Sequence, residues 1–517
     1  MDVEVPIRRP SILFDNADGD VMRYELAQPS CFVDLNLDQV VATMTRGREE
    51  YDLKPFFHTP LHDMAGVRYR QEVMQELEVE AVNDCVVGFA RAMRAVRHRL
   101  AEAGSLRHRY QRGSLLLDAV EAYGDAVTVL GDELAALDVR SRGLTAVGEF
   151  VVAHTGSGDF TALLAEAHAL KEALAGIRYC VHIHENRVQV TAYEDEQDYT
   201  EVVAATFAKF KRDDAKDYRI NLVDRLEMNH VEAQILDLVA LLNPDIFGTL
   251  DAYCTRHSDF LDPTIVAFDR EVQFYLAYLE HIQRFKDAGL AFCYPAVSSA
   301  TKEISATEAF DLALAGRLVS ENAVVVRNDF SLVDPERVLV VTGPNQGGKT
   351  TFARMFGQLH YLAGRGYPVP ATSAHLFLAD RLLTHFEKEE DLATGRGKLE
   401  EELIRVHDAL LAASGHTVFI LNESFTSTTL ADALFLGTEV LTRIIALDAL
   451  CVCVTFVDEL ATLSATTVSM VTTVAPDDPT TRTFKIVRRP ADGLAYAAAI
   501  AAKYGLGYAS LKRRLDR

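Results

Sequence analysis

Short runs of apolar residues recur through the C-terminal part of the chain, separated by polar or helix-forming stretches. The clearest run is Val338–Val341, which leads into a glycine-rich segment and then into the helix-compatible residues 352–359. Runs of about four to eight apolar residues are typical of buried strands. Further strands are expected at residues 324–326, 418–421, 450–454 and 483–487. Because helical stretches lie between several of these strands, the pattern predicts an α/β domain.

The preceding part of the chain has a different period. Apolar residues recur at helical spacing from about residue 64 to 175, and again from about 200 to 290. Between these stretches, residues 177–183 and 187–193 alternate between apolar and polar side chains, which predicts a β-hairpin. The pattern indicates an out-and-back helical lever with a hairpin at its tip. Strand-like residues 11–14 and 31–35 and a helix at 37–44 are expected near the N-terminus.

These changes of period divide the chain into six predicted segments. In chain order they are an N-terminal mixed segment at 1–60, a helical core and lever at 61–175, a hairpin insertion at 176–200, returning helices at 201–300, the α/β domain at 301–490 and C-terminal helices at 491–517.

Composition narrows the function classes. The formal net charge is −23, so any binding to nucleic acid would need a local basic patch that acts against a repulsive field. The seven cysteines show no paired C-x-x-C spacing, so neither a disulfide framework nor a zinc site is predicted. Cys451 and Cys453 are expected in the core. No signal peptide or membrane span is recognisable, and we expect a cytoplasmic protein.

The glycine-rich segment has the spacing G-x-x-x-x-G-K-T. Its candidate nucleotide-binding residues are Gly343, Pro344, Asn345, Gln346, Gly347, Gly348, Lys349, Thr350 and Thr351. Glycines here let backbone N–H groups turn toward phosphate oxygens, and the following helix N-terminus adds partial positive charge. Lys349 is expected to reach the β- and γ-phosphates, and the Thr350 hydroxyl to bind Mg²⁺. The strand before the loop and the helix after it favour a P-loop for ATP and Mg²⁺ over a chance glycine turn.

A second apolar strand, about seventy residues further on, ends in Asn422 and Glu423. An aspartate usually occupies the first of these positions. The amide of Asn422 can hold Mg²⁺ through a bound water but adds no negative charge. Glu423 stands where a carboxylate would orient or deprotonate an attacking water, so Glu423 and Lys349 are the catalytic candidates and Thr350, Asn422 and Glu423 the metal candidates. The alternative is a solvated Asn-Glu turn after an edge strand.

One helical stretch is strongly basic. It contains Arg91, Arg94, Arg97, Arg99, Arg107, Arg109 and Arg112, with Glu102 as the only acidic residue among them. These arginines are possible contacts to a DNA backbone. The alternative, which so acidic a protein favours, is a solvated helix face that pairs with acidic neighbours.

Several of these segments together resemble the ATPase of the MutS mismatch-repair family. Residues 343–351 carry that family's loop motif G-P-N-x-G-G-K-[ST]-T in full. Three further segments are similar to V-P-N-D-x-x-L, D-D-L-A-S-G-R and M-D-E-I-G-R-G-T-S, namely residues 326–332, 391–396 and 421–429. The resemblance implies an ABC-type α/β P-loop ATPase domain, preceded by a mainly α-helical core and lever domain with a small clamp-like β-hairpin insertion.

The resemblance also implies a homodimer joined through the ATPase heads. In the family, each nucleotide is completed by a segment of the partner subunit, which here corresponds to Gly395, Arg396, Gly397 and Lys398. From the residues alone, a glycine pair around an arginine before a charged helix offers backbone donors to an anion, which is a weak signal.

Three departures from the family pattern bear on catalysis. Gly397 replaces a signature serine, Asn422 replaces an aspartate, and Phe456 replaces the histidine of a Thr-His switch pair. Each loss is expected to slow hydrolysis by about ten- to a thousandfold. The family's mismatch-reading domain is not recognisable before the helices.

Two functions therefore remain open. The first is a dimeric DNA-dependent ATPase that binds DNA structures other than mismatches and moves its lever on nucleotide binding. The second is a nucleotide-gated scaffold that engages a protein at the lever end, with slow or no hydrolysis. A small-molecule P-loop kinase is disfavoured because it explains neither the lever nor the segment from Gly395 to Lys398.

Overall fold

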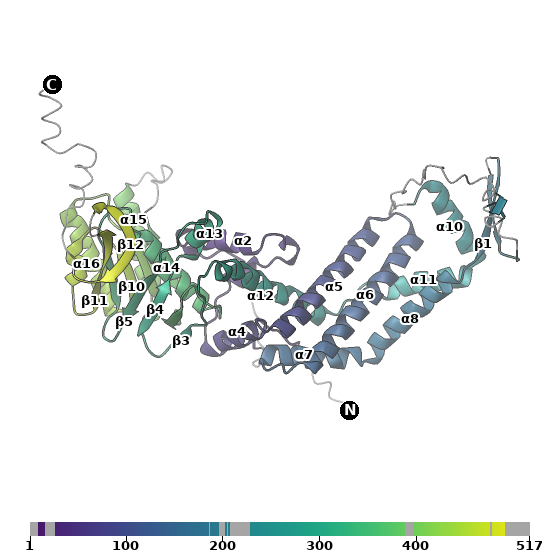
Figure 1. Cartoon of the computed structure of the whole chain (residues 1–517), viewed down its shortest axis with the longest axis horizontal. Helices are drawn as coiled ribbons and strands as arrows, with labels where there is room; N and C mark the ends of the chain where they lie inside the picture. Colours follow the sequence, from purple (N-terminus) through teal and green to yellow (C-terminus); the bar gives the residue numbers. More distant parts are fainter. Residues whose placement is uncertain are drawn as a thin grey trace, which may run out of the picture. The chain divides into compact units, whose positions relative to one another are not determined.

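The fold consists of two compact units (Figure 1). The computed structural model describes residues 9–15, 26–185, 187–195, 202–203, 205–206, 228–387, 397–475 and 478–491 of the chain. The first unit combines residues 1–80, 140–145 and 270–517. The second combines residues 81–139 and 146–269.

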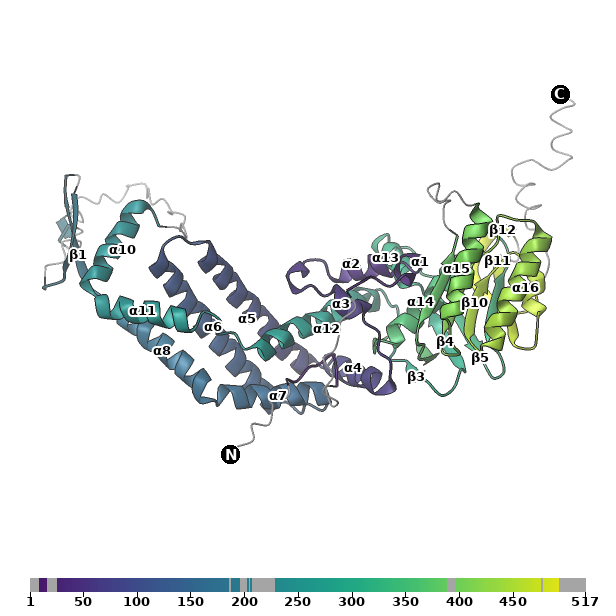
Figure 2. The same ribbon diagram turned by 180° about the vertical axis from the view of Figure 1, so that it is seen from behind.

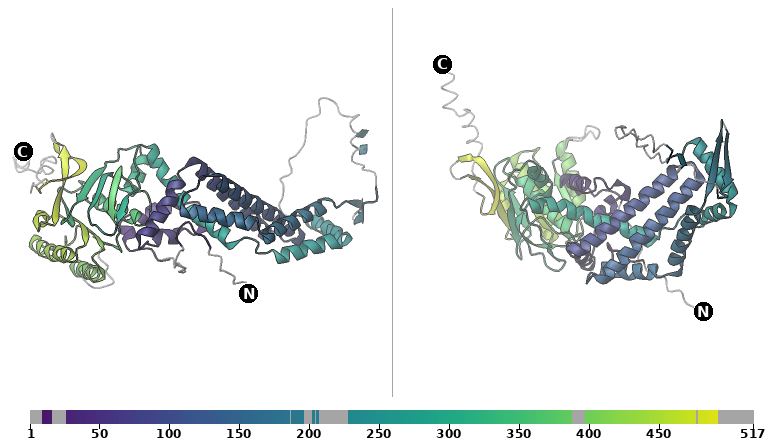
Figure 3. Two further views of the ribbon diagram at one scale, coloured as in Figure 1. Left: turned by 90° about the horizontal axis from the view of Figure 1, so that it is seen from below. Right: turned by 45° about the vertical axis from the view of Figure 1, so that its right-hand side comes forward.

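The second unit is a bundle of long helices (Figures 2 and 3). They are α5 (Glu80–Ser105), α6 (Arg109–Ala136), α7 (Arg142–Thr155), α8 (Gly158–Ala175), α10 (His230–Leu242) and α11 (Pro244–Arg256). The chain returns to the first unit within α12 (Pro263–Asp287). Leu117, Leu163, Val239 and Leu250 share one core, which confirms the predicted helical period over these helices.

A two-stranded hairpin belongs to the same unit. β1 (Tyr179–His184) pairs antiparallel with β2 (Arg187–Ala192), as the alternation predicts. Val190 packs against the helical core. No single described helix is both long and apolar enough to cross a membrane, and only α10 and α11 pass that test together, as a pair bent by 107°.

The first unit is built around a six-stranded sheet of order β12-β11-β6-β10-β9-β8. Its strands are β6 (Val338–Thr342), β8 (Leu382–Phe386), β9 (Val418–Asn422), β10 (Leu450–Val454), β11 (Thr467–Ala475) and β12 (Asp478–Arg488). Neighbouring strands are parallel except β11 and β12. Every residue of β6, β9 and β10 is buried, Cys451 and Cys453 included, which explains their continuous apolar sequences.

A smaller four-stranded sheet and several helices complete this unit. The sheet has the order β3 (Ala296–Ser298), β7 (Ser373–Phe377), β4 (Ile304–Ala309) and β5 (Asn328–Leu332). The helices are α13 (Leu312–Ser320), α14 (Lys349–Ala363), α15 (Lys398–Ala412) and α16 (Leu430–Ala446). The strand predicted at residues 324–326 is wrong. Val324 is 85% exposed, and this stretch pairs with no described strand, so its β-branched side chains have no sheet to join.

The N-terminal segment folds onto this unit as short helices. They are α1 (Cys31–Asp34), α2 (Leu37–Met44), α3 (Lys54–His58) and α4 (Met64–Glu76). The strand expected at residues 31–35 is therefore wrong, because Phe32 and Leu35 are buried with the spacing of one helical turn while Val33 is 61% exposed. The helix expected at 37–44 is confirmed.

Residues 11–14 are buried without forming the strand that their pattern suggested. Side chains, instead of a neighbouring strand, satisfy their backbone. Glu271 accepts hydrogen bonds from the Ser11 hydroxyl and the Ile12 N–H, both at 2.8 Å. Arg70 Nε donates to the Leu13 carbonyl at 2.9 Å. These contacts fix the N-terminal residues to α4 and α12.

Helix α14 packs on the N-terminal segment from its middle to its C-terminal end. Near its middle, Gln358 Nε2 donates to the Leu35 carbonyl at 2.9 Å, and a side chain at Gly357 would collide with Leu35 at 2.6 Å. Just beyond its end, Arg365 Nε donates to the Phe57 carbonyl at 2.9 Å. The helix that begins at the glycine-rich loop is thus packed on residues more than 300 positions earlier in the chain.

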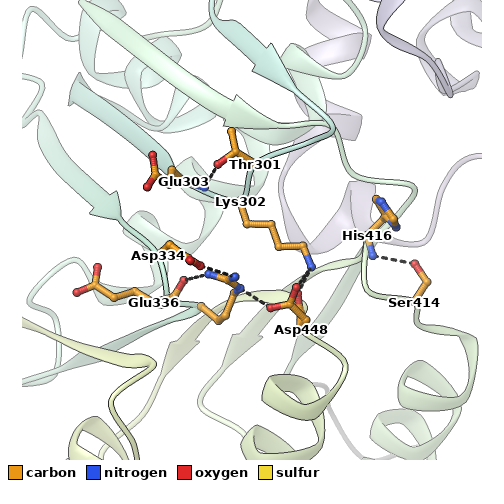
Figure 4. A network of polar contacts seen from close by, with 9 residues as sticks. Thr301, Lys302, Glu303, Asp334, Glu336, Ser414, His416 and Asp448 are labelled. Atoms are coloured by element: carbon orange, nitrogen blue, oxygen red, sulfur yellow. Dashed lines mark hydrogen bonds and ion pairs between the residues drawn. The ribbon is translucent and has the colours of Figure 1, made fainter.

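A charged network joins the amino ends of the central strands (Figure 4). Asp448, just before β10, accepts hydrogen bonds from Lys302 Nζ at 2.6 Å and from Arg337 Nε at 2.5 Å. Arg337, just before β6, also donates to Asp334 at 2.8 Å. The network therefore fixes β6 and β10 to the loop between β3 and β4. It lies at the amino-terminal ends of these strands, whereas the glycine-rich loop follows the carboxyl-terminal end of β6.

Candidate functional site

The glycine-rich loop connects the buried strand β6 to helix α14. Its backbone takes left-handed conformations at Gly343, Gln346 and Gly348, with φ of 115°, 60° and 92°. Such alternation turns successive N–H groups toward the inside of the loop, which is the geometry that binds anions. Gln346 adopts a conformation that costs a non-glycine residue energy, so the loop is held in place by its surroundings.

Lys349 turns back over this loop. Its ammonium donates to the Gly343 carbonyl at 3.0 Å, to Asn345 Oδ1 at 3.3 Å and to the Pro344 carbonyl at 3.4 Å, and lies 3.7 Å from Glu423 Oε1. Its side chain is only 4% exposed. Burial lowers the pKa of Lys349, and the neighbouring Glu423 carboxylate opposes this shift. The result is a buried cation held only by oxygen atoms, which phosphate oxygens can replace.

Asn422 and Glu423 end strand β9 beside this lysine. Asn422 is buried, and its Oδ1 atom has no hydrogen-bond partner among the described residues. Glu423 takes the left-handed φ of 52°, its N–H donates to the Val454 carbonyl at 2.9 Å, and its side chain is one-third exposed. The sharp turn directs the carboxylate toward Lys349 and leaves it accessible to water.

These groups are the right kind to hold Mg²⁺ with a nucleotide. A buried amide oxygen without a partner can accept a hydrogen bond from a water on the ion, and hydroxyl and carboxylate oxygens are ligands that Mg²⁺ prefers. Thr350 and Glu423 both line the cavity described next. No group of three His, Cys, Asp or Glu residues within the described ranges could hold a metal ion.

A cavity of about 450 Å³ opens beside the loop. The loop, α14, α13 and three further segments line it, with Gln346–Thr351, Asp311, Leu314, Arg317, Leu318, Val324–Val326, Asn328, Glu423 and Phe484. The lining combines charged side chains, such as Lys349 and Glu423, with apolar ones, such as Val324 and Phe484. Such a mixed lining suits a ligand that carries both charged and less polar groups.

Sequence reasoning did not identify several residues of this cavity. Asp311 caps α13 through the Leu314 N–H at 3.0 Å and accepts a hydrogen bond from Gln358 at 3.0 Å. Asn328 donates to the Phe484 carbonyl at 3.2 Å, which connects β5 to β12. The family-like motif at residues 326–332 contains Asn328 and was the only signal in the sequence. Nothing local marks Asp311 or Phe484.

The segment expected to serve a partner subunit is described only in part. Gly395 and Arg396 lie outside the described residues, whereas Gly397 precedes α15 and Lys398 begins it. The Lys398 ammonium forms an ion pair with Glu387. Phe456, after β10, is 44% exposed.

Glu402 is a further acidic residue that sequence reasoning missed. It is fully buried on α15, where burial raises the pKa of its carboxyl group. The Ser427 hydroxyl, in the loop after β9, lies 3.5 Å from this carboxyl. Its position in the apolar stripe between Leu399 and Val406 was the available signal.

The arginines of the arginine-rich stretch differ in their ion pairs and in their exposure to solvent. Arg97 forms an ion pair with Asp269, whose side chain is 2% exposed, so this arginine neutralises a buried carboxylate of the bundle. Arg109 lies 3.5 Å from Asp251 and stacks on the ring of Tyr110. Exposed side chains are those of Arg91, Arg94, Arg107, Arg109 and Arg112, while Arg97 and Arg99 are half-buried. The seven residues thus do not form one uniform basic surface.

Comparison with known proteins identifies the region that contains the glycine-rich loop. The family model "MutS domain V" matches residues 339–510. The chain is similar to proteins named "DNA mismatch repair protein MutS" from three bacteria. The identity is 29% over 181 residues for Shouchella clausii, 41% over 118 residues for Symbiobacterium thermophilum and 30% over 229 residues for Bartonella henselae.

These matches cover 33%, 22% and 42% of this chain but only 21%, 13% and 24% of the three relatives. The chain therefore spans less than a quarter of the length of the curated relatives it matches. The matched region contains the glycine-rich loop from Gly343 to Lys349 and the pair Asn422 and Glu423. Residues 339–510 are therefore a domain of the MutS family.

Proposed function

We propose that the protein binds ATP with Mg²⁺ in this cavity and uses the binding to control a dimer that acts on DNA structures other than mismatches. The observation that carries the proposal is the approach of Lys349 to Glu423, 3.7 Å apart, beside a glycine-rich loop with left-handed residues at Gly343, Gln346 and Gly348. A cation and a carboxylate so placed serve phosphate binding and the positioning of water, respectively.

Each residue has a defined part in this proposal. The loop N–H groups and Lys349 bind phosphate oxygens, replacing the carbonyl contacts that the ammonium makes within the loop. Thr350 and, through a water, Asn422 hold Mg²⁺, which neutralises phosphate charge when bound. Glu423 orients the attacking water and accepts its proton. The nucleobase lies against apolar side chains of the cavity lining, among them Leu314, Leu318 and Val324.

The dimer in this proposal is a homodimer joined through the domains that carry the nucleotide. Gly395, Arg396, Gly397 and Lys398 of one subunit approach the nucleotide of the other. Nucleotide binding closes the two domains, and the long helices carry this movement toward the hairpin. The support is the relationship to the MutS family, together with the exposure of Gly397 and the partial exposure of Lys398 at the start of α15.

A second function, a nucleotide-gated protein scaffold with slow or no hydrolysis, has specific support. Asn422 brings no charge to the ion, and the exposed Phe456 ring cannot transfer a proton. Arg97 pairs with Asp269 inside the bundle, and the net charge is −23. These features disfavour ATP hydrolysis and the electrostatic attraction of DNA, but they leave the phosphate-binding groups in place.

Turnover separates the two functions. We would measure ATP hydrolysis by the full chain with and without branched DNA, alongside nucleotide affinity. Glu423→Gln serves as the control because it keeps the size of the side chain and removes its basicity. Turnover that rises with DNA and disappears in Glu423→Gln supports the DNA-dependent ATPase. Tight ATP binding without turnover, indifferent to DNA, supports the scaffold, and absence of ATP binding refutes both.

A further inference from the structure

The β1–β2 hairpin presents two unlike faces. Its register sets Tyr179 opposite Ala192, Val181 opposite Val190, and Ile183 opposite Val188, so one face is apolar. The other face pairs Cys180 with Thr191, His182 with Gln189, and His184 with Arg187. Neither strand carries an acidic residue, although the whole chain has a net charge of −23.

Much of the apolar face is open to solvent, while Val190 on the same face packs against the helical core. Tyr179, Val181, Ile183 and Val188 are 44%, 39%, 71% and 37% exposed. A lone two-stranded sheet is only marginally stable in water, and contiguous exposed apolar side chains mark interaction surfaces. The hairpin therefore has the character of a sheet that a further strand would complete.

The edge available for that strand is β1. Helix α10 contacts β2, and Val190 of β2 packs on the helical core through the apolar face, so β1 is the strand farther from these helices. A two-residue loop separates His184 from Arg187. Because the residues that flank such a loop exchange backbone hydrogen bonds, His184 and Arg187 form a hydrogen-bonded pair of the hairpin. Because such pairs alternate, the N–H and C=O groups of Ile183, Val181 and Tyr179 point outward. Within the described residues, no backbone hydrogen bond reaches these three outward positions.

We propose that the β1 edge accepts an extended segment of a partner protein as a third strand, with apolar and acidic residues in alternation. The apolar residues of that segment would cover Tyr179, Val181 and Ile183. The acidic residues would lie on the other face, beside the imidazole N–H groups of His182 and His184 and the guanidinium of Arg187. Main-chain hydrogen bonds supply affinity in this mode of binding, and the alternating side chains supply specificity.

The apolar face distinguishes this partner from a nucleic acid. Phosphates would use Arg187 and the imidazoles but would leave Ile183, at 71% exposure, in water. An alternating strand uses both faces of the hairpin at once. This inference does not depend on nucleotide binding. It can therefore fail while the proposed function holds, and it can hold while the proposed function fails.

The test measures fluorescence anisotropy of labelled probes with the full chain. The probes are a peptide alternating valine and glutamate, a peptide alternating valine and lysine, a peptide with valines and glutamates in separate blocks, and a short duplex DNA. We expect the first peptide to bind best. Ile183→Glu should weaken it about tenfold or more, because it removes a large buried apolar contact. Val152→Glu is the matched control, since Val152 is 50% exposed on α7 of the same unit.

A charge exchange tests the other face. Arg187→Glu should weaken the glutamate peptide and strengthen the lysine peptide. This result remains decisive if Ile183→Glu disturbs the hairpin, because a folding defect would weaken both peptides together. Equal binding of the blocked peptide, or equal effects of Ile183→Glu and Val152→Glu, would overturn the proposal. Binding of DNA alone, lost in Arg187→Glu and unchanged in Ile183→Glu, would assign the hairpin to nucleic acid instead.

Discussion

The hydroxyl of Thr472 supports the glycine-rich loop directly beneath Gly343. A Cβ atom at Gly343 would lie 2.3 Å from Thr472 Oγ1, and one at Gly347 would lie 2.8 Å from the same atom. Thr472 is fully buried on β11, which neighbours β6 in the sheet. The conformation of the loop is therefore fixed by a strand that follows it by more than a hundred residues.

Gly343→Ala should disrupt the loop. It combines a side-chain collision with left-handed strain at φ 115°, so nucleotide affinity should fall more than tenfold. Gly289→Ala is the matched control, because Gly289 has φ 79° but nothing within 4 Å of its Cβ position. The control should lose about 1 to 2 kcal/mol of stability and keep its affinity for ATP. Similar losses of affinity in both variants, measured by calorimetry, would show that the collision has no role.

Asp448→Asn should lower stability by roughly 0.5 to 1 kcal/mol at neutral pH, because the carboxylate is more than half exposed and screened by solvent. Burial alone would raise the pKa of Asp448, but the hydrogen bonds from Lys302 and Arg337 outweigh it and lower the pKa. A lowered folded-state pKa stabilises above the unfolded value of 3.8, and this stabilisation is lost as pH falls through the folded value. Denaturant unfolding should thus show the difference shrinking below about pH 4. A difference that persists at pH 2 would argue against an ionic cause.

Arg97→Ala should destabilise the helical bundle by about 3 kcal/mol, because it removes the ion-pair partner of the buried Asp269. The double variant Arg97→Met/Asp269→Leu should recover much of this loss. Arg91→Ala, an exposed position on the same helix, should change stability by less than about 0.5 kcal/mol. Equal melting temperatures for the two single alanine variants would contradict this role for Arg97. Tests of DNA binding should therefore use Arg91 and Arg112 and leave Arg97 intact.

Glu271 should make stability depend on pH in the opposite sense to Asp448. Burial raises the pKa of Glu271 to about 7 from 4.5. A raised carboxyl pKa contributes stability that is fully present below the unfolded value and lost as pH rises through the folded value. The free energy of unfolding should thus fall by roughly 3 kcal/mol between pH 4.5 and 8 through this residue. Urea titrations of Glu271→Gln should show this slope removed, and an unchanged slope would point to other groups.

Sequence patterns predicted the elements of the nucleotide-binding region well because their signals are local. Val338–Val341 and Leu450–Val454 are continuous apolar runs, as strands buried on both faces require. The pattern failed at residues 31–35, where a short apolar run fits a helix as well as a strand. It failed again at 324–326, where β-branched residues line the cavity instead of joining a sheet.

Pairings between distant positions could not be predicted from local patterns. Arg97 and Asp269 are 172 positions apart, and no period or motif connects them. Thr472 resembles any other threonine of a strand until the pairing of β11 with β6 places it under Gly343. The roles of Asp311 and Phe484 depend on the same long-range topology. Resemblance to a family pointed to the loop and to β9, but it did not mark the residues that support them.

Because α14 packs on the N-terminal helices, the region that matches the family is smaller than the region that must fold together. The family model covers residues 339–510, yet Leu35 and Phe57 accept hydrogen bonds from Gln358 and Arg365 within that range. A recombinant fragment cut to the homologous region would expose the face of α14 that these residues cover. If such a fragment failed to bind nucleotide, the cause would be the loss of the residues that cover α14. The result would carry no information about the chemistry of the glycine-rich loop.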